Sequence, residues 1–288
     1  MEIKDFDAHR RTANTPGGSL SYVEIGQGTR TALFVHGVGT GAYLWRNVIE
    51  ELGQDHRCLA LDLPLHGRSP ARTGQSCSVS ALAGVVESLC ETLGLDGIDL
   101  VANDTGGAIA QVFAAGNPKR LRTLTLTNCD TQDNMPPEAF KPTMELAASG
   151  QLAVIAPQLL VNPALMRGSA IGQGFERPEE VNEELYRAFL EPVLGTPEAA
   201  REFERLLVSL DAADLREIEP ELKNLNVPTR IVWGTDDPFF GLAEAYWLRD
   251  TIPGVTKVVE LLGAKLFFPE ERAAELATNL AAHWSTYQ

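Results

Sequence analysis

The chain has 288 residues, of which 44% are hydrophobic, and its formal net charge is -15 at pH 7. This length suits one domain with a sizeable insertion, and the apolar content is sufficient for a large core. An acidic surface repels the phosphates of nucleic acids and anionic lipids. We therefore expect neither nucleic acid nor a membrane surface as a partner.

The N-terminus, MEIKDFD, lacks the basic stretch and apolar run of a secretory signal, and no later run reaches the roughly 20 apolar residues that span a bilayer. A cytoplasmic location is therefore expected. The four cysteines, Cys58, Cys77, Cys90 and Cys129, form no Cys-x-x-Cys pair, which favours buried thiols over disulfides or zinc.

Short apolar runs alternate with longer amphipathic stretches along most of the chain. The part up to residue 25 is more polar and contains Pro16-Gly-Gly, which favours an antiparallel hairpin at a sheet edge. Helix patterns occupy residues 79–93 and 107–115, and strand-length runs occupy residues 32–35, 58–61, 98–102, 121–126 and 229–233. The alternation predicts an α/β fold with a mostly parallel sheet and helices on both faces.

The pattern changes between residues 131 and 226. Helical stretches broken by Pro and Gly occupy residues 138–148, 152–160, 180–190 and 198–210. A buried strand resumes after Pro228, and an amphipathic helix at residues 270–283 closes the chain. We predict a core formed by residues 1–130 and 227–288, with residues 131–226 inserted as a helical cap.

The strongest motif is Leu100-Val-Ala-Asn-Asp104-Thr-Gly-Gly, in which a buried strand enters a helix through small residues. Ala102 and Gly106, two positions on either side of Asp104, permit a strained turn that presents one side chain at the top of the sheet. The motif resembles the nucleophile elbow of the α/β-hydrolase superfamily, with Asp104 in the place of the usual serine. The resemblance implies an α/β-hydrolase fold with a pocket beneath the cap.

Two further loops resemble the same superfamily. Residues 34–40, FVHGVGT, resemble its His-Gly loop, and residues 61–69, LDLPLHGRS, resemble its Asp-x-Pro-x-His-Gly-x-Ser loop. The resemblance implies that the backbone NH groups of Val38 and Thr105 form an oxyanion site, with His36 and Gly37 in the same loop. It also implies that the histidines of these loops, His36 and His66, are structural rather than basic groups.

Two aspartates compete for the role of the supporting acid. Trp233-Gly-Thr-Asp-Asp237-Pro resembles the loop that supplies this acid, and the usual spacing selects Asp237. Asp130, at the end of a core strand, occupies the position that some dehalogenase-like members use instead. Either aspartate could alternatively cap a turn.

The catalytic histidine of the superfamily is missing from its usual position. Members typically end with Gly-x-x-His-Phe followed by Pro-Glu-Glu, whereas this chain reads GAKLFFPEE from Gly263, so Leu266 occupies the histidine position. Leucine cannot transfer a proton. His9, His56 and His283 lie outside the motifs and do not replace it.

An aspartate nucleophile resembles haloalkane dehalogenases and epoxide hydrolases, in which carboxylate attack gives an ester that activated water cleaves. This chain departs from their patterns at Thr105, where dehalogenases usually have Trp, and at Gly39, where both families favour Pro. Tyr186 and Tyr246 are candidates for the tyrosine donors of epoxide hydrolases, although tyrosines more often pack in a core or on a surface.

We therefore predict a hydrolase-type enzyme that acts on a small, mainly apolar molecule through Asp104, with Asp237 or Asp130 handling water. One alternative is a lyase, isomerase or cyclase that uses Asp104 as an acid/base with a pKa raised by burial. The other is an inactive ligand-binding protein.

No cofactor or metal is expected, because the chain lacks a Gly-rich dinucleotide motif and clustered metal ligands. The expected partner is the small-molecule substrate, and a homodimer stays open.

Overall fold

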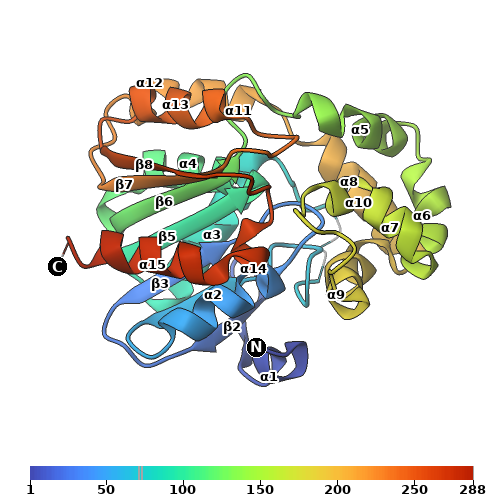
Figure 1. The fold of residues 1–288 in the computed structure, drawn as a ribbon, viewed down its shortest axis with the longest axis horizontal. Helices are drawn as coiled ribbons and strands as arrows, with labels where there is room; N and C mark the ends of the chain where they lie inside the picture. Colours follow the sequence, from blue (N-terminus) through green and yellow to red (C-terminus); the bar gives the residue numbers. More distant parts are fainter. Residues whose placement is uncertain (71, 73, 288) are drawn as a thin grey trace.

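The computed structural model describes residues 1–70, 72 and 74–287 (Figure 1). It contains an eight-stranded sheet in the order β1-β2-β4-β3-β5-β6-β7-β8. The strands are β1 (Arg10–Thr15), β2 (Gly18–Ile25), β3 (Thr31–Val35), β4 (Arg57–Leu61), β5 (Ile98–Asp104), β6 (Leu121–Cys129), β7 (Thr229–Gly234) and β8 (Val255–Leu261). β1 and β2 form an antiparallel edge hairpin, β2 is antiparallel to β4, and the other neighbours are parallel. The predicted hairpin and mostly parallel sheet are confirmed.

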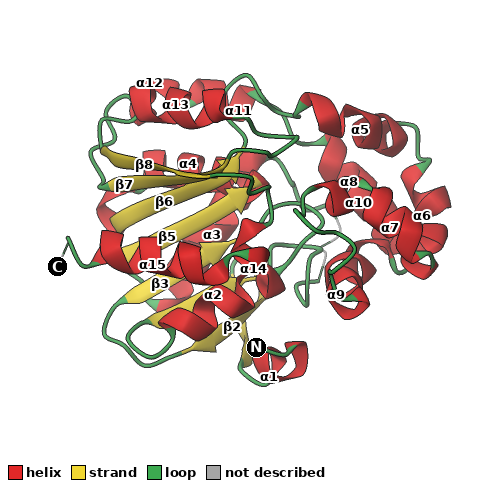
Figure 2. Ribbon diagram, in the orientation of Figure 1, coloured by secondary structure: helices red, strands yellow, loops and turns green. Residues whose placement is uncertain are grey.

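Helices cover both faces of this sheet (Figure 2). α2 (Arg46–Leu52) and α15 (Ala273–Trp284) pack together on one face, and α3 (Val79–Leu93) and α4 (Thr105–Gly116) pack together on the other. Because both faces are covered, every residue of β5 and all but one residue of β6 are buried. The remaining core helices are α1 (Ile3–Asp7), η1 (Ala42–Trp45), η2 (Pro118–Arg120), α13 (Leu242–Thr251) and α14 (Phe268–Glu271).

The elements between β6 and β7 are helical, and we call residues 131–226 the cap segment. They are η3 (Glu138–Phe140), α5 (Lys141–Ala148), α6 (Leu152–Val161), α7 (Pro163–Gly168), α8 (Ala170–Gln173), α9 (Glu183–Leu194), α10 (Pro197–Val208), α11 (Ala213–Glu217) and α12 (Glu219–Leu222). α5 to α10 lie beyond the carboxyl ends of the parallel strands (Figures 1 and 2), whereas α11 and α12 contact α4 of the core. That the cap segment is a separate domain stays a prediction.

The sequence patterns missed one strand and merged two helices. β8 is an edge strand whose side chains are mostly half-buried or exposed, so it lacks the apolar run by which the other core strands are recognised. The predicted helix at residues 270–283 is interrupted at Arg272, where the backbone leaves the helical region between α14 and α15. The Arg272 guanidinium donates two hydrogen bonds of 2.7 Å to the Glu176 carboxylate of the cap segment.

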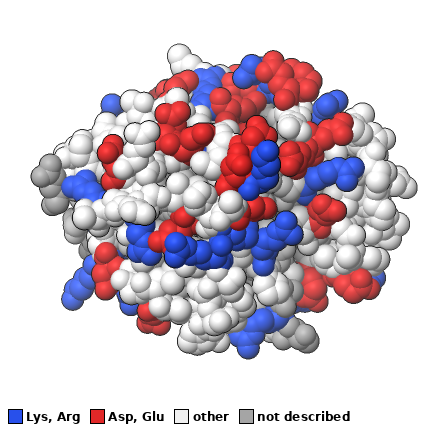
Figure 3. Space-filling view, turned by 90° about the horizontal axis from the view of Figure 1, so that it is seen from below, with Lys and Arg blue, Asp and Glu red and all other residues white. Residues whose placement is uncertain are grey.

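No helix in the described part of the chain is by itself long and apolar enough to cross a membrane. Two consecutive helical stretches, Glu138–Ala148 and Leu152–Val161, meet the length and composition criteria together, with a bend of 113° between them. Figure 3 shows that acidic and basic side chains are mixed over the face that it presents, so the excess of acidic residues forms no uniform acidic patch on that face.

The turn from β5 into α4 is tightly packed against the loop after β3. Asp104, at the turn, has a φ of 59° and a ψ of -139°. Gly106 lies so close to the neighbouring chain that a Cβ atom on it would be 2.5 Å from the His36 carbonyl oxygen and 2.6 Å from that of Val35. The small residue predicted at this position is therefore required by the close approach of two backbone segments.

Gly106→Ala should lower the free energy of unfolding by about 3 kcal/mol, because its methyl group would collide with backbone atoms that cannot move separately from the sheet. Gly116→Ala, at the other end of α4, is the matched control, since nothing lies within 4 Å of its added Cβ. It should be neutral or stabilising by about 0.5–1 kcal/mol. Urea unfolding followed by circular dichroism measures both variants. Equal stability of the two would contradict the packing described for the turn.

Candidate active site

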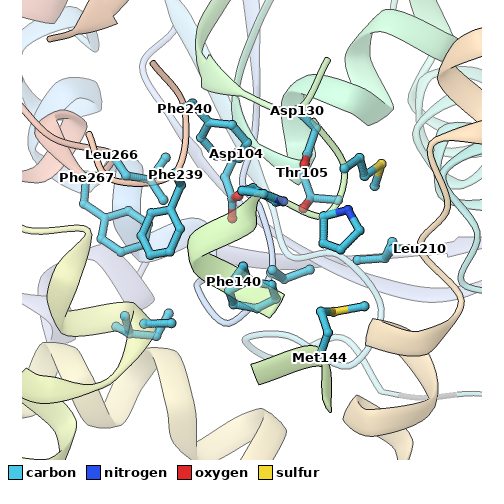
Figure 4. Close-up of a pocket in the computed structure, with 16 residues that line it drawn as sticks. Asp104, Thr105, Asp130, Phe140, Met144, Leu210, Phe239, Phe240, Leu266 and Phe267 are labelled. Atoms are coloured by element: carbon cyan, nitrogen blue, oxygen red, sulfur yellow. The ribbon is translucent and has the colours of Figure 1, made fainter. Parts of the chain in front are cut away.

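A small pocket opens at the turn between β5 and α4, beneath the cap segment (Figure 4). Its volume is about 40 Å³. Most of its wall is apolar, and the polar side chains are those of Asp104, Thr105 and Asp130. The apolar wall is made by Val38, Met135, Pro136, Pro137, Phe140, Met144, Ala170, Ile171, Leu210, Phe239, Phe240, Leu266 and Phe267. Figure 4 shows the Asp104 carboxylate pointing into this pocket, with Asp130 and Thr105 side by side.

Asp104 is 8% exposed and is reached by the loop after β3. A Cβ atom at Gly37 would be 2.1 Å from Asp104 Oδ2, so only a glycine allows the loop to come this close. The backbone NH groups of Val38 and Thr105 face the carboxylate and lower its pKa. The two predicted oxyanion donors are therefore brought together at Asp104, and Gly37 contributes by having no side chain.

The charge of Asp130 perturbs the buried carboxyl group of Asp104. Burial, followed by the charge of Asp130, raises the pKa of Asp104 well above its ordinary value, against the effect of the two NH groups. Burial likewise raises the pKa of Asp130 to about 7, while the Thr105 hydroxyl lowers it. Asp130 is 2% exposed, and its Oδ2 has no hydrogen-bond partner in the described structure.

The pocket offers these carboxyl groups no positive charge. Among the residues that the structure describes, no Lys, Arg or His lines it. Two like charges in an apolar pocket repel each other and lose their hydration, so the pair retains a proton at neutral pH. The apparent pKa values belong to the pair of carboxyl groups rather than to either alone.

Asp237, which the sequence spacing favoured as the supporting acid, is not among the residues that line the pocket. Its Oδ2 accepts a hydrogen bond of 2.7 Å from the Asn128 side chain, and its Oδ1 accepts one of 2.9 Å from the Phe239 NH. Asn128 in turn accepts a hydrogen bond of 2.7 Å from the Gly234 NH. These bonds hold Asp237 in the turn after β7, and burial raises its pKa to about 7. Asp130 is thus the aspartate that shares the pocket with Asp104.

His36 and His66 brace the loops around the pocket. His36 Nε2 accepts a hydrogen bond of 3.0 Å from the Leu63 NH, and His66 Nε2 accepts one of 3.0 Å from the Gly39 NH. Both rings are buried, and neither lines the pocket. Burial lowers the pKa of His36 to about 4 and that of His66 to about 3, which keeps both nitrogens available as acceptors.

Leu266, which the sequence resemblance aligns with the superfamily's histidine, is 4% exposed and forms part of the pocket wall. Asn103, the residue before Asp104, donates a hydrogen bond of 3.1 Å to the Leu266 carbonyl oxygen and so ties this wall to the turn. The two candidate tyrosines do not line the pocket: the Tyr186 hydroxyl donates to the Pro178 carbonyl oxygen, and the Tyr246 hydroxyl donates to Glu260.

Sequence reasoning missed the aromatic part of the wall, formed by Phe140, Phe239, Phe240 and Phe267. The adjacent pair Phe239-Phe240, two residues beyond Asp237, was the available signal. No group of three His, Cys, Asp or Glu side chains in the described residues is arranged to hold a metal ion.

A family model described as alpha/beta hydrolase fold matches residues 32–271. The chain belongs to this family. A Dechloromonas aromatica protein named 2-hydroxy-6-oxononadienedioate/2-hydroxy-6-oxononatrienedioate hydrolase 1 is 25% identical over 224 residues, which cover 76% of this chain and 75% of that protein.

Solved structures show the same fold. An alpha/beta hydrolase fold protein from Burkholderia ambifaria matches with a TM-score of 0.81 and 21% identity, over 94% of this chain and 96% of that one. An epoxide hydrolase matches with a TM-score of 0.79 and 18% identity, over 97% and 99% of the two chains. The predicted α/β-hydrolase fold and hydrolase-type enzyme are confirmed at the level of the family, while the roles of individual residues stay predictions.

Asp130→Asn should stabilise the protein more at pH 8 than at pH 4. The pKa of Asp130 is about 7 in the folded protein and near 4 in the unfolded chain. Between pH 4 and pH 7 the unfolded chain therefore loses this proton while the folded chain keeps it. The free energy of unfolding falls as the pH rises through this range. The substitution removes this loss, which a shift of about three pKa units makes about 4 kcal/mol at pH 8. Urea unfolding at both pH values provides the measurement. Asp236→Asn, at an exposed neighbour of Asp237, should change stability by less than about 0.5 kcal/mol at either pH.

Proposed function

We propose that the protein hydrolyses a small, mainly apolar molecule through a covalent ester on Asp104, with Asp130 as the acid and base that the superfamily usually provides as histidine. The observation that carries this proposal is the Asp130 carboxyl group. It lines the same pocket as Asp104, one of its oxygens has no partner in the described structure, and its pKa is raised to about 7. A general acid or base works best when its pKa lies near the working pH.

The proton that the pair retains is assigned to Asp130 in the reactive state. The NH groups of Val38 and Thr105 favour the charged form of Asp104, and the Thr105 hydroxyl and the Asp130 NH favour that of Asp130. Burial and the charge of Asp130 still raise the pKa of Asp104 well above its ordinary value, so a charged Asp104 beside a protonated Asp130 is the state that the reaction requires and not the resting state. Asp104 is then the carboxylate that attacks, and Asp130 is the carboxylic acid that donates. A pair of carboxyl groups with one proton divides the two roles in the same way as in retaining glycosidases.

The first step breaks a carbon–oxygen bond of the substrate. An Asp104 oxygen forms a bond to the electrophilic carbon, the leaving oxygen takes the bonding electron pair, and Asp130 gives that oxygen its proton. An epoxide suits this step, because its ring oxygen becomes a hydroxyl group and stays on the product. Among the described residues no other carboxyl group lines the pocket, and neither Tyr186 nor Tyr246 lines it.

The second step releases the product. The Asp130 carboxylate takes a proton from water, and the resulting hydroxide attacks the carboxyl carbon of the Asp104 ester. The oxyanion that forms there lies at the NH groups of Val38 and Thr105, which stabilise it. Loss of the product alkoxide, which takes the new proton of the Asp104 carboxyl group, restores Asp104 as a carboxylate and leaves Asp130 protonated.

The charges at the pocket argue against a dianionic substrate of the kind in the names of the 2-hydroxy-6-oxononadienedioate hydrolases. Two buried aspartates would repel added carboxylates, and no basic side chain of the described chain lines the pocket to bind them. An uncharged, apolar substrate fits the phenylalanine wall.

The shared proton also supports a second candidate, in which Asp104 and Asp130 move a proton within the substrate and no ester forms. This is lyase or isomerase chemistry, and it needs a pair of carboxyl groups in different protonation states, as here. The two candidates differ in whether an atom of Asp104 enters the product.

A single turnover in water enriched in oxygen-18 separates the two. With protein in excess over a terminal alkyl epoxide, ester formation should leave the new product oxygen unlabelled and add one heavy oxygen to the peptide that contains Asp104. Mass spectrometry of the digested protein reads this directly. Asp104→Asn should abolish both labelling and turnover. Product that carries the heavy oxygen after the first turnover would show that Asp104 is not the nucleophile.

Leu266→His should raise turnover by less than tenfold, because Asp130 already supplies the base. A polar ring in the apolar wall should also lower the free energy of unfolding by about 1–3 kcal/mol. Steady-state kinetics and urea unfolding measure the two effects, with Leu266→Phe as the control for added volume. A gain of roughly 10² to 10⁴-fold, the usual contribution of general base catalysis, would mean that Asp130 is not the base.

A further inference from the structure

A second and larger cavity lies inside the cap segment, and we call it the cap chamber. Its volume is about 430 Å³, and α5 to α10 all contribute to its wall, together with Val38 and Gly39 of the loop after β3. The wall is largely aliphatic, with Leu146, Leu152, Ile155, Leu159, Leu190 and Leu194 among its residues. No Asp, Glu, Lys or Arg of the described chain lines it.

The cap chamber adjoins the pocket at Asp104. Val38, Phe140, Ala170 and Ile171 line both cavities. Val38 is also the residue whose NH group faces the Asp104 carboxylate, so the chamber begins beside the oxyanion site. A molecule that lies in the chamber can therefore reach Asp104 by passing between the side chains that the two cavities share.

The loop after β3, which carries Val38 and Gly39, is supported by a residue of the chamber wall. The Phe203 ring, in the chamber wall, packs edge-on against His66 with a centroid distance of 5.8 Å. His66 accepts the hydrogen bond from the Gly39 NH, one residue beyond Val38. The packing of Phe203 against His66 therefore supports both the wall of the chamber and the position of the Val38 NH group.

We propose that the cap chamber binds an extended, uncharged apolar tail of the substrate, while the reacting group lies at Asp104. This inference rests on the proposed function and names the substrate class for it. The pocket at Asp104, with about 40 Å³, has roughly a tenth of the volume of the chamber, with about 430 Å³, so most of a long substrate would lie in the chamber. The chamber is apolar and adjoining, and burial of each methylene of the tail there contributes to binding.

Helix α6 provides matched variants for a test. Leu159 faces the chamber and is half-buried, whereas Val154 on the same helix is 64% exposed and does not line the chamber. Leu159→Trp should fill part of the chamber, and Val154→Trp adds the same side chain outside it. Leu159→Ala, which enlarges the chamber, is the second variant for the case in which Leu159→Trp fails to fold.

The experiment measures the affinity of the intact protein for linear primary alcohols from butanol to decanol by isothermal titration calorimetry. The affinity of the wild-type protein and of Val154→Trp should rise about fourfold with each added methylene. Leu159→Trp should lose on the order of tenfold in affinity for decanol and keep its affinity for butanol. Leu159→Ala should keep the dependence on length up to decanol. Thermal unfolding checks that each variant is folded.

Affinity that does not depend on chain length, or an equal loss in Leu159→Trp and Val154→Trp, would overturn the assignment of the chamber. Because the alcohols do not react, this result is independent of catalysis. Length-dependent binding in a protein that turns over no alkyl epoxide would contradict the proposed function and leave the tail site intact.

Discussion

Two carboxyl groups are buried beside each other, with no cation lining their pocket in the described structure, and this electrostatic constraint governs the chemistry of the site. Removing both protons would place two unpaired charges in an apolar pocket, at a cost that burial and mutual repulsion both increase. Asp104 and Asp130 therefore share a proton near neutral pH. The proposed chemistry needs no histidine at the position of Leu266, because burial moves the pKa of Asp130 into the range in which histidine normally works.

The fold sustains this arrangement by making the surrounding backbone rigid. The strained turn at Asp104 can persist because Gly37 and Gly106 let the loop after β3 pack directly against it. His36 and His66, held neutral by burial, brace that loop through acceptor nitrogens. The backbone donors at Asp104 are thus fixed before any substrate arrives, which is the condition for electrostatic stabilisation of an oxyanion.

The sequence predicted the sheet and the turn at Asp104 because these depend on local periodicity and on motifs with fixed spacing. The sequence could not show whether Asp130 or Asp237 shares the pocket with Asp104. That depends on which carboxylate is bound by the Asn128 side chain, and in the structure it is Asp237. β8 was missed because its exposed side chains carry no apolar pattern. The cap chamber could not be foreseen either, because a cavity depends on how helices pack rather than on which residues form them.

The shared proton can be observed directly by carbon-13 NMR of protein labelled at the aspartate carboxyl carbons. The account predicts that two carboxyl resonances titrate well above the ordinary aspartate range, because burial raises both pKa values. Asp130→Asn should lower the pKa of Asp104, because it removes a neighbouring charge. Ordinary titration near pH 4 for both carboxyl groups of the wild-type protein would contradict the account.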